Sequence, residues 1–147
     1  MRTARQEPNL GVLLFLAYRA LEMRAHHALV AAGVTNITLA QARIAARIGP
    51  HGTRVSVLAE QARVTKQSAG FLVDQLEEAG YVERVPDPAD GRARLVRLTD
   101  RADPVVKIAN AEVERVLAEW ADQVGADRLR QVYETLLDLR EITDPWR

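Results

Sequence analysis

The sequence predicts a mainly α-helical protein with one small β-hairpin. Apolar residues recur at helical spacing along most of the 147 residues. Residues 81–85 instead alternate apolar and polar side chains, as a half-buried strand does, and residues 92–98 return as its partner. Between them, two prolines, two aspartates and a glycine indicate a loop over residues 86–91.

Length and composition limit what the chain can be. A length of 147 residues is typical of one domain and allows a hydrophobic core. There is no cysteine, which excludes disulfides, thiol oxidation as a trigger and cysteine-containing zinc sites. No signal-peptide segment follows the polar N-terminus, and the apolar run 12–17 is too short to span a membrane. We therefore expect a cytoplasmic protein.

Two helices are expected before residue 53. The first is apolar nearly all round, so it must be buried, and a small monomer has little room for that. Gly33 ends it. Residues 38–48 predict a second, amphipathic helix, which the glycines and proline of residues 49–52 break. The apolar positions of the first helix are Leu10, Leu13, Leu14, Ala17 and Leu21, with Phe15 and Leu16 on other sides.

Two further helices are expected in the middle of the chain, joined by a tight connection at residues 63–64. Ser56 is a predicted N-cap for a short helix through residue 62. Thr65 is a predicted N-cap for the next helix, which runs to about residue 79, with Gly80 as its C-cap. The predicted buried face is Ala69, Leu72, Val73 and Leu76, and the opposite face is Lys66, Gln67, Gly70, Phe71 and Asp74.

The C-terminal third predicts two more helices. Asp103 and Pro104 resemble an N-cap and a first helical residue, and they open a long helix to about residue 124. Gly125 stops it. Residues 127–143 predict the last helix, which Pro145 ends.

The middle of the chain has the layout of a winged helix-turn-helix, a device that reads DNA. A capped helix, a glycine stop and a strand lead directly into a hairpin with an arginine at its tip. The net charge of zero argues mildly against a nucleic-acid partner. However, acidic residues are concentrated after residue 101, whereas four arginines lie close together at the wing. A DNA phosphate interacts mainly with the charges near it, so the wing could bind DNA despite the net charge of zero. The four arginines are Arg92, Arg94, Arg97 and Arg101.

The chain resembles the MarR (multiple antibiotic resistance regulator) family. The motifs that carry the resemblance are VLAE at 57–60, VTKQ at 64–67, LVDQLE at 72–77, GYVER at 80–84, DP at 87–88, DGR at 90–92 and VRLT at 96–99. The resemblance implies an obligate homodimer on a pseudo-palindromic operator, and repression relieved by a small, often aromatic and anionic, ligand. This chain departs from the family pattern at Phe71 and Gly91, where members often carry polar or basic residues.

The resemblance also divides the chain, which we expect to form a single domain. Residues 1–52 would hold the N-terminal helices for dimerisation and support. Residues 53–100 would form the winged helix-turn-helix, and residues 101–147 the C-terminal dimerisation helices.

Candidate DNA contacts lie at the start of the second of the two central helices. Lys66 could contact a guanine edge or a phosphate, and Gln67 could pair with adenine. Thr65 and Ser68 could bind phosphate at the positive helix end. Ordinary capping would also explain this turn. Phe71 could contact a thymine methyl, or pack between helix and wing.

Further candidates lie on the wing. Arg92 at its tip suits a narrow minor groove, whose negative potential attracts an inserted arginine. Asp90 is placed to hold it by a charge-assisted pair. Arg94 and Arg97 point to opposite faces of the strand, and Arg94, nearer the tip, is the better candidate for the phosphate backbone.

The flanking helices are expected to form the core and the dimer interface, through the apolar positions of the first helix and Leu136, Leu137, Leu139 and Ile142 of the last. The family's ligand crevice lies between the lobes, which makes Tyr18, Met23, His26, His27 and Trp120 weak candidates for its lining. Partial burial would equally explain each of them. His26 and His27 lie about 100° apart on a helix, so they cannot both face one metal ion in the usual i, i+4 manner.

The sequence therefore favours a homodimeric transcriptional regulator that binds double-stranded DNA, without cofactor or metal. One alternative is a winged-helix dimer that binds another protein, which neutral charge and the apolar Phe71 favour and the wing arginines oppose. A catalytic protein would require a cluster of converging polar groups or a nucleophile motif, and the sequence offers neither.

Overall fold

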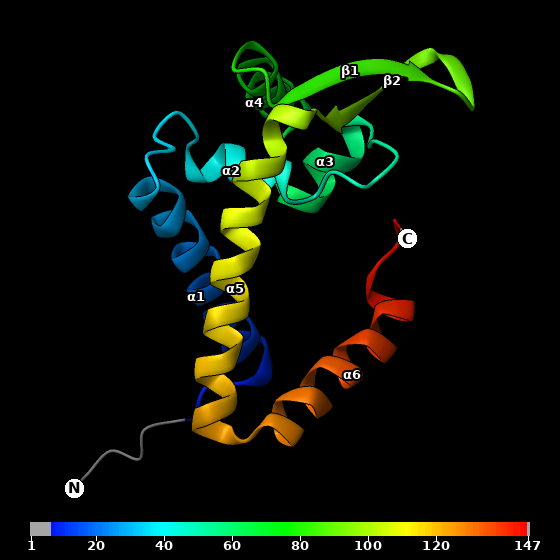
Figure 1. Ribbon diagram of the computed structural model, residues 1–147. Helices are drawn as coiled ribbons and strands as arrows, with labels where there is room; N and C mark the ends of the chain where they lie inside the picture. Colours follow the sequence, from blue (N-terminus) through cyan, green and yellow to red (C-terminus); the bar gives the residue numbers. More distant parts are fainter. Residues whose placement is uncertain (1–6, 147) are drawn as a thin grey trace, which may run out of the picture.

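A computed structural model describes residues 7–146 and confirms a mainly helical fold with a small wing (Figure 1). Helices α1 and α5 lie side by side, and α2, α3, α4 and the hairpin gather at one end of α5. Helix α6 folds back from the other end of α5. The elements are α1 (Leu10–Ala31), α2 (Leu39–Ala45), α3 (Val55–Ala62), α4 (Lys66–Glu78), β1 (Val82–Asp87), β2 (Asp90–Leu98), a 3₁₀ turn (Asp100–Ala102), α5 (Asp103–Val124) and α6 (Ala126–Thr143).

The hydrophobic core lies in the lobe made by α2, α3, α4 and the hairpin. Leu58 and Ala59 face inward as predicted, and the predicted inner face of α4 supplies three buried residues and the half-buried Leu72. The backbone of Thr53 exchanges two hydrogen bonds of 2.8 Å with Val96, which ties the start of α3 to the wing. The core residues with almost no exposed surface are Ile44, Leu58, Ala69, Val73, Leu76, Val82 and Val96.

Helices α1 and α5 form a second, thinner packing layer. Leu29 and Val116 are buried there, and Arg24 of α1 binds Glu112 and Glu119 of α5 at 2.8 and 2.9 Å. The hydrogen bonds that Arg24 donates to Glu119 and then to Glu112 raise the pKa of Arg24. Most apolar side chains at the start of α1 and along α6 remain exposed in the single protomer. The layer therefore holds the two helices together and leaves a large apolar surface uncovered.

Several predicted helix boundaries are confirmed, but the predicted C-terminal end of α2 is wrong. Thr38 and Thr65 cap α2 and α4, each accepting a hydrogen bond from the backbone three residues on. Gly33 follows α1 with φ of 87°. However, α2 ends at Ala45, three residues before the predicted end at Ile48. The amides of residues 47 and 48 bond to carbonyls three residues earlier, so the chain leaves the α-helical pattern there.

Two predicted N-caps are wrong. Ser56 lies inside α3, because the pairing of Thr53 with the wing directs the chain into the helix two residues sooner and leaves Arg54 at the cap. Asp103 is the first residue of α5, because the 3₁₀ turn leads directly into that helix. Its carboxylate still lies in the first turn, where it suits the positive end of the helix.

The hairpin is longer and its loop shorter than the sequence predicts. Strand β1 continues to Asp87, with Pro86 paired to Arg94 and Asp87 to Asp90. The turn is therefore only residues 88–89. The side chain of Asp87 stabilises it by accepting a hydrogen bond from the amide of Ala89 at 2.8 Å. The register shift at this point leaves residues 91–93 as a bulge in β2.

Candidate nucleic-acid interface

The first turn of α4 is an exposed, polar helix end. The hydroxyl of Thr65 accepts a hydrogen bond from the amide of Ser68 at 3.0 Å and donates one to the hydroxyl of Ser68 at 2.9 Å. Lys66 and Gln67 are exposed beside them. The buried side of the helix holds its axis against the core, so these four side chains have a defined position. Exposed amides and hydroxyls at a positive helix end can bind a phosphate or a base edge.

Phe71 lies on the same exposed face of α4. Its side chain is 62% exposed, far more than packing between helix and wing would leave. An aromatic ring held outside the core at this place is available to a partner. Of the two sequence interpretations, this exposure favours contact with a partner molecule.

Two ion-pair clusters fix the wing to the helices, and both involve residues that the sequence did not single out. Arg84 of β1 binds Glu77 at 2.9 Å and Asp74 at 2.7 Å, both on α4. Arg54 at the start of α3 donates two hydrogen bonds to Asp87 at the end of β1. These partners are seven to 33 residues apart in sequence, so no spacing rule reveals them.

The wing tip presents Arg92 to solvent. Its side chain is 95% exposed, and its Nε lies 3.7 Å from Asp90 Oδ1. The expected pair is thus present as a long ion pair, while Asp90 accepts a hydrogen bond from the Arg92 amide at 3.1 Å. Asp90 therefore shapes the bulge more than it holds the guanidinium, which stays free to move.

The other two wing arginines differ in their charge balance. Arg97 forms an ion pair with Glu83 at 2.7 Å, whereas Arg94 donates to the carbonyl of Arg84 and has no acidic partner among the described residues. Lys66 likewise forms no ion pair within residues 7–146. The first turn of α4 and the outer part of the wing therefore both carry positive charge without an acidic partner among the described residues.

Comparison with known proteins agrees with this geometry. The MarR family model matches residues 35–93, from the residues before α2 to the wing bulge. Over this segment the chain is similar to MarR-family proteins.

Solved structures extend the likeness over nearly the whole chain. Apo MarR from E. coli superposes with a TM-score of 0.70 at 22% identity, covering 91% of this chain and 98% of that one. RV1404 from Mycobacterium tuberculosis gives 0.67 at 25% identity over 94% and 96%. NadR in complex with 4-hydroxyphenylacetate gives 0.69 at 22% identity over 97% and 99%. The helices outside residues 35–93 therefore follow the MarR fold as well.

A crevice of about 300 Å³ opens between the lobes, where α1, α2 and α5 meet. Tyr18 and His26 line it, and the buried Nδ1 of His26 has no hydrogen-bond partner among the described residues. Most of the other lining residues are apolar, including Leu21, Ala25, Leu29, Leu39, Ala42 and Val113.

The five ligand candidates do not gather in one place. Trp120 lines a separate apolar groove of about 710 Å³ between α1, α5 and α6, which Tyr18 also borders. His27 borders a shallow depression on the other side of α1, and Met23 lines neither crevice nor groove. Successive residues of a helix point about 100° apart, so neighbours such as His26 and His27 diverge.

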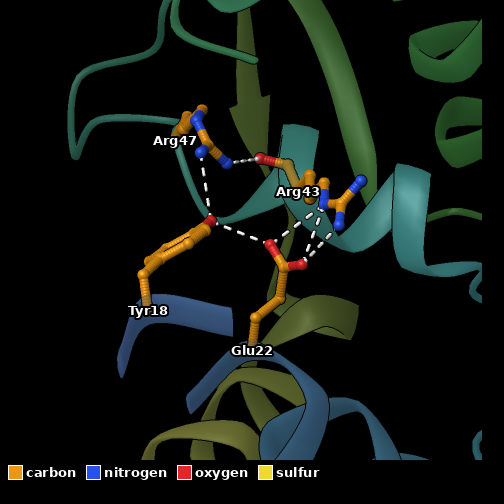
Figure 2. A network of polar contacts seen from close by, with 4 residues as sticks. All are labelled: Tyr18, Glu22, Arg43 and Arg47. Atoms are coloured by element: carbon orange, nitrogen blue, oxygen red, sulfur yellow. Dashed lines mark hydrogen bonds and ion pairs between the residues drawn. The ribbon is translucent and has the colours of Figure 1, made fainter. Parts of the chain in front are cut away.

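A polar network closes one side of the crevice (Figure 2). The carboxylate of Glu22 on α1 accepts hydrogen bonds from the guanidinium of Arg43 at 2.6 to 3.0 Å and from the hydroxyl of Tyr18 at 2.8 Å. Arg47 donates to the same hydroxyl at 3.1 Å and to the backbone carbonyl of Gln61, at the end of α3, at 3.2 Å. The network thus joins the helix that borders the crevice to the winged helix-turn-helix lobe.

Within residues 7–146, no group of three or more His, Asp or Glu side chains is arranged to hold a metal ion. The helices of the same residues include none that is long and apolar enough to cross a membrane.

Proposed function

We propose that this protein regulates transcription by binding a pseudo-palindromic operator as a homodimer. The observation that carries the proposal is the pairing of two exposed elements on one lobe. The first turn of α4 is polar and accessible, and Arg92 extends from the wing tip almost fully exposed. A helix in the major groove and an arginine in the adjacent minor groove account for both.

The apolar surface of α1 and α6 supports a dimer. Ile142 is 83% exposed and Leu10 69%, and Leu14 and Leu136 line the apolar groove between α1, α5 and α6. Contiguous exposed apolar surface of this kind marks an interface. A second copy of the chain would cover it, with residues 1–52 and 101–147 supplying the contacts. Each protomer would then read one half-site, with half-site centres about 34 Å apart.

The interlobe crevice supports regulation by a small ligand, and we propose that the ligand relieves repression. A volume of about 300 Å³ suits a molecule with one ring, and the free Nδ1 of His26 offers it one polar contact. The structural neighbour NadR binds 4-hydroxyphenylacetate, a molecule of that class. A ligand that prefers one spacing of the two DNA-binding lobes would change operator affinity.

The DNA proposal is tested by mobility shift on the DNA upstream of the protein's own gene, across a salt series. We expect a saturable shift that resists random competitor and weakens steeply with salt. Arg92→Ala should lose about tenfold in affinity and lower the salt slope by about one. Arg128→Ala, which removes the same charge from exposed α6, is the matched control.

Two outcomes would contradict the proposal. Equal affinity of the Arg92→Ala variant and the parent protein would remove the wing from the interface. A dimer that binds no upstream DNA with preference over competitor would favour the alternative, a winged-helix protein that binds another protein through the exposed Phe71.

The ligand proposal is tested by adding 4-hydroxyphenylacetate as a probe. We expect it to raise the melting temperature of the protein and weaken the shift. His26→Phe fills the polar end of the crevice and should abolish both effects. His27→Phe, one residue along and outside the crevice, should keep them.

A further inference from the structure

The exposed face of α4 contains a glycine at a position where neither the backbone conformation nor the packing of the protein requires one. Gly70 lies in the middle of the helix, where glycine costs stability because its backbone loses the most freedom on folding. A Cβ added at this position would meet nothing within 4 Å. Packing therefore does not require glycine here, and alanine would make a more stable helix.

The other glycines of the chain have a local reason. Gly33, Gly52, Gly80 and Gly125 have φ between 83° and 95°, a region that disfavours other residues. Gly49 lies in a turn, and Gly11 lies in the first turn of α1, where an added Cβ would come 3.3 Å from the capping oxygen of Asn9. Gly91 lies in the wing bulge, where glycine is common. Gly70 alone is left without an internal explanation.

The place of Gly70 on α4 suggests an external reason. It follows Lys66 by four residues and Gln67 by three, so it lies next to both on the helix surface. Phe71 follows it directly on the same exposed face. The missing side chain leaves bare backbone at the centre of the face that carries the candidate DNA contacts.

We propose that a base edge in the major groove rests directly on the backbone of Gly70. This inference rests on the proposed DNA-binding function and adds a specificity-determining position to it. A bare Cα lets the helix sit deeper in the groove by about one carbon–carbon bond length, roughly 1.5 Å. That depth brings the short side chains of Thr65 and Ser68, and the ring of Phe71, within reach of the DNA.

The test separates stability from binding in a single variant, Gly70→Ala. The melting temperature of the free protein should rise by roughly 2–4 °C, because alanine favours the helix and meets no neighbour. Affinity for the operator should nevertheless fall about tenfold, through loss of one close base contact.

The possible failures are distinguishable. If the parent protein shifts the operator and Gly70→Ala binds equally well, the inference is wrong and the proposed function stands. If affinity falls together with the melting temperature, Gly70 has an internal role and the inference is also wrong. If the parent protein itself shows no preferred DNA, the proposed function fails and the inference with it.

Discussion

Arg54, at the N-cap of α3, donates two hydrogen bonds to Asp87 at the end of β1, at 2.9 and 2.7 Å from the same carboxylate oxygen. The other oxygen of Asp87 accepts the amide of Ala89 at 2.8 Å. The amide of Ala89 and the guanidinium of Arg54 together lower the pKa of this carboxyl. One buried carboxylate therefore shapes the wing turn and fastens the hairpin to the helix-turn-helix.

This contact predicts that Arg54 supports DNA binding from behind the interface. Arg54→Met keeps the aliphatic stem and removes the two hydrogen bonds, so the outer hairpin should move more freely in the free protein. Binding to DNA would then have to order the hairpin, and the lost conformational entropy would weaken binding. We expect operator affinity to fall roughly 2- to 30-fold, measured by fluorescence anisotropy. Arg97→Met is the control, because it removes an exposed wing ion pair without loosening the turn. If the two variants lose operator affinity equally, Arg54 acts only through its positive charge, and the prediction that it orders the wing is wrong.

A second prediction concerns the exposed ring of Phe71. If the ring contacts a thymine methyl, replacing one operator thymine by uracil should weaken binding of the parent protein by roughly 1 kcal/mol or more. The same replacement should cost Phe71→Ala nothing further, which a double-mutant cycle across protein and DNA would measure. A uracil scan of one half-site that finds no coupled position would contradict the thymine contact.

A third prediction concerns the apolar surface of α6. Leu136 borders the groove between α1, α5 and α6 and is 43% exposed in one protomer. Leu136→Glu would bury a charge in the proposed dimer, so we expect the dimer dissociation constant to rise tenfold or more, measured by sedimentation. Thr135→Glu places the same charge about 100° round the helix and serves as control. Sedimentation of the parent protein as a monomer at high concentration would contradict the dimer itself.

The sequence predicts what depends on residue type and short spacing, and it misses what depends on distant partners. Thr65 could be recognised as a cap because a short hydroxyl binds its own helix start, whereas the sequence predicts Thr38 inside the helix that it caps. Pro86 suggested a loop, yet the strand continues through it, because Arg54 holds the next residue from 33 positions away.

The candidate site divides in the same way. The exposed first turn of α4 and Arg92 follow from the motif, and their contact with DNA stays a prediction. Arg84 and Asp87 could not be predicted, because their roles appear only when the hairpin folds against the helices. The five ligand candidates do not line one crevice, because a list of polar residues along two helices does not say which face each one occupies. Whether Tyr18 and His26 bind a ligand stays a prediction.

The network around Glu22 predicts a pH dependence of stability. Burial by itself raises the pKa of this carboxyl, but the hydrogen bonds from Arg43 and Tyr18 outweigh burial, and the pKa is lowered from its ordinary 4.5. The unfolded chain therefore binds a proton at a higher pH than the folded protein does. The stability from this group is fully present above pH 4.5 and is lost as the pH falls through the lower, folded value.

Glu22→Gln should remove that dependence. At pH 7 the variant should unfold with a free energy roughly 1–3 kcal/mol below that of the parent, because a charge-assisted hydrogen bond to Arg43 is lost. Below the folded pKa the difference should shrink, since the parent carboxyl is then protonated as well. Urea unfolding of both proteins from pH 7 down to pH 3 would measure this, with the exposed Glu114→Gln as control. A difference that stays constant over the whole range would mean that Glu22 contributes shape and packing, and that its charge does not hold the two lobes together.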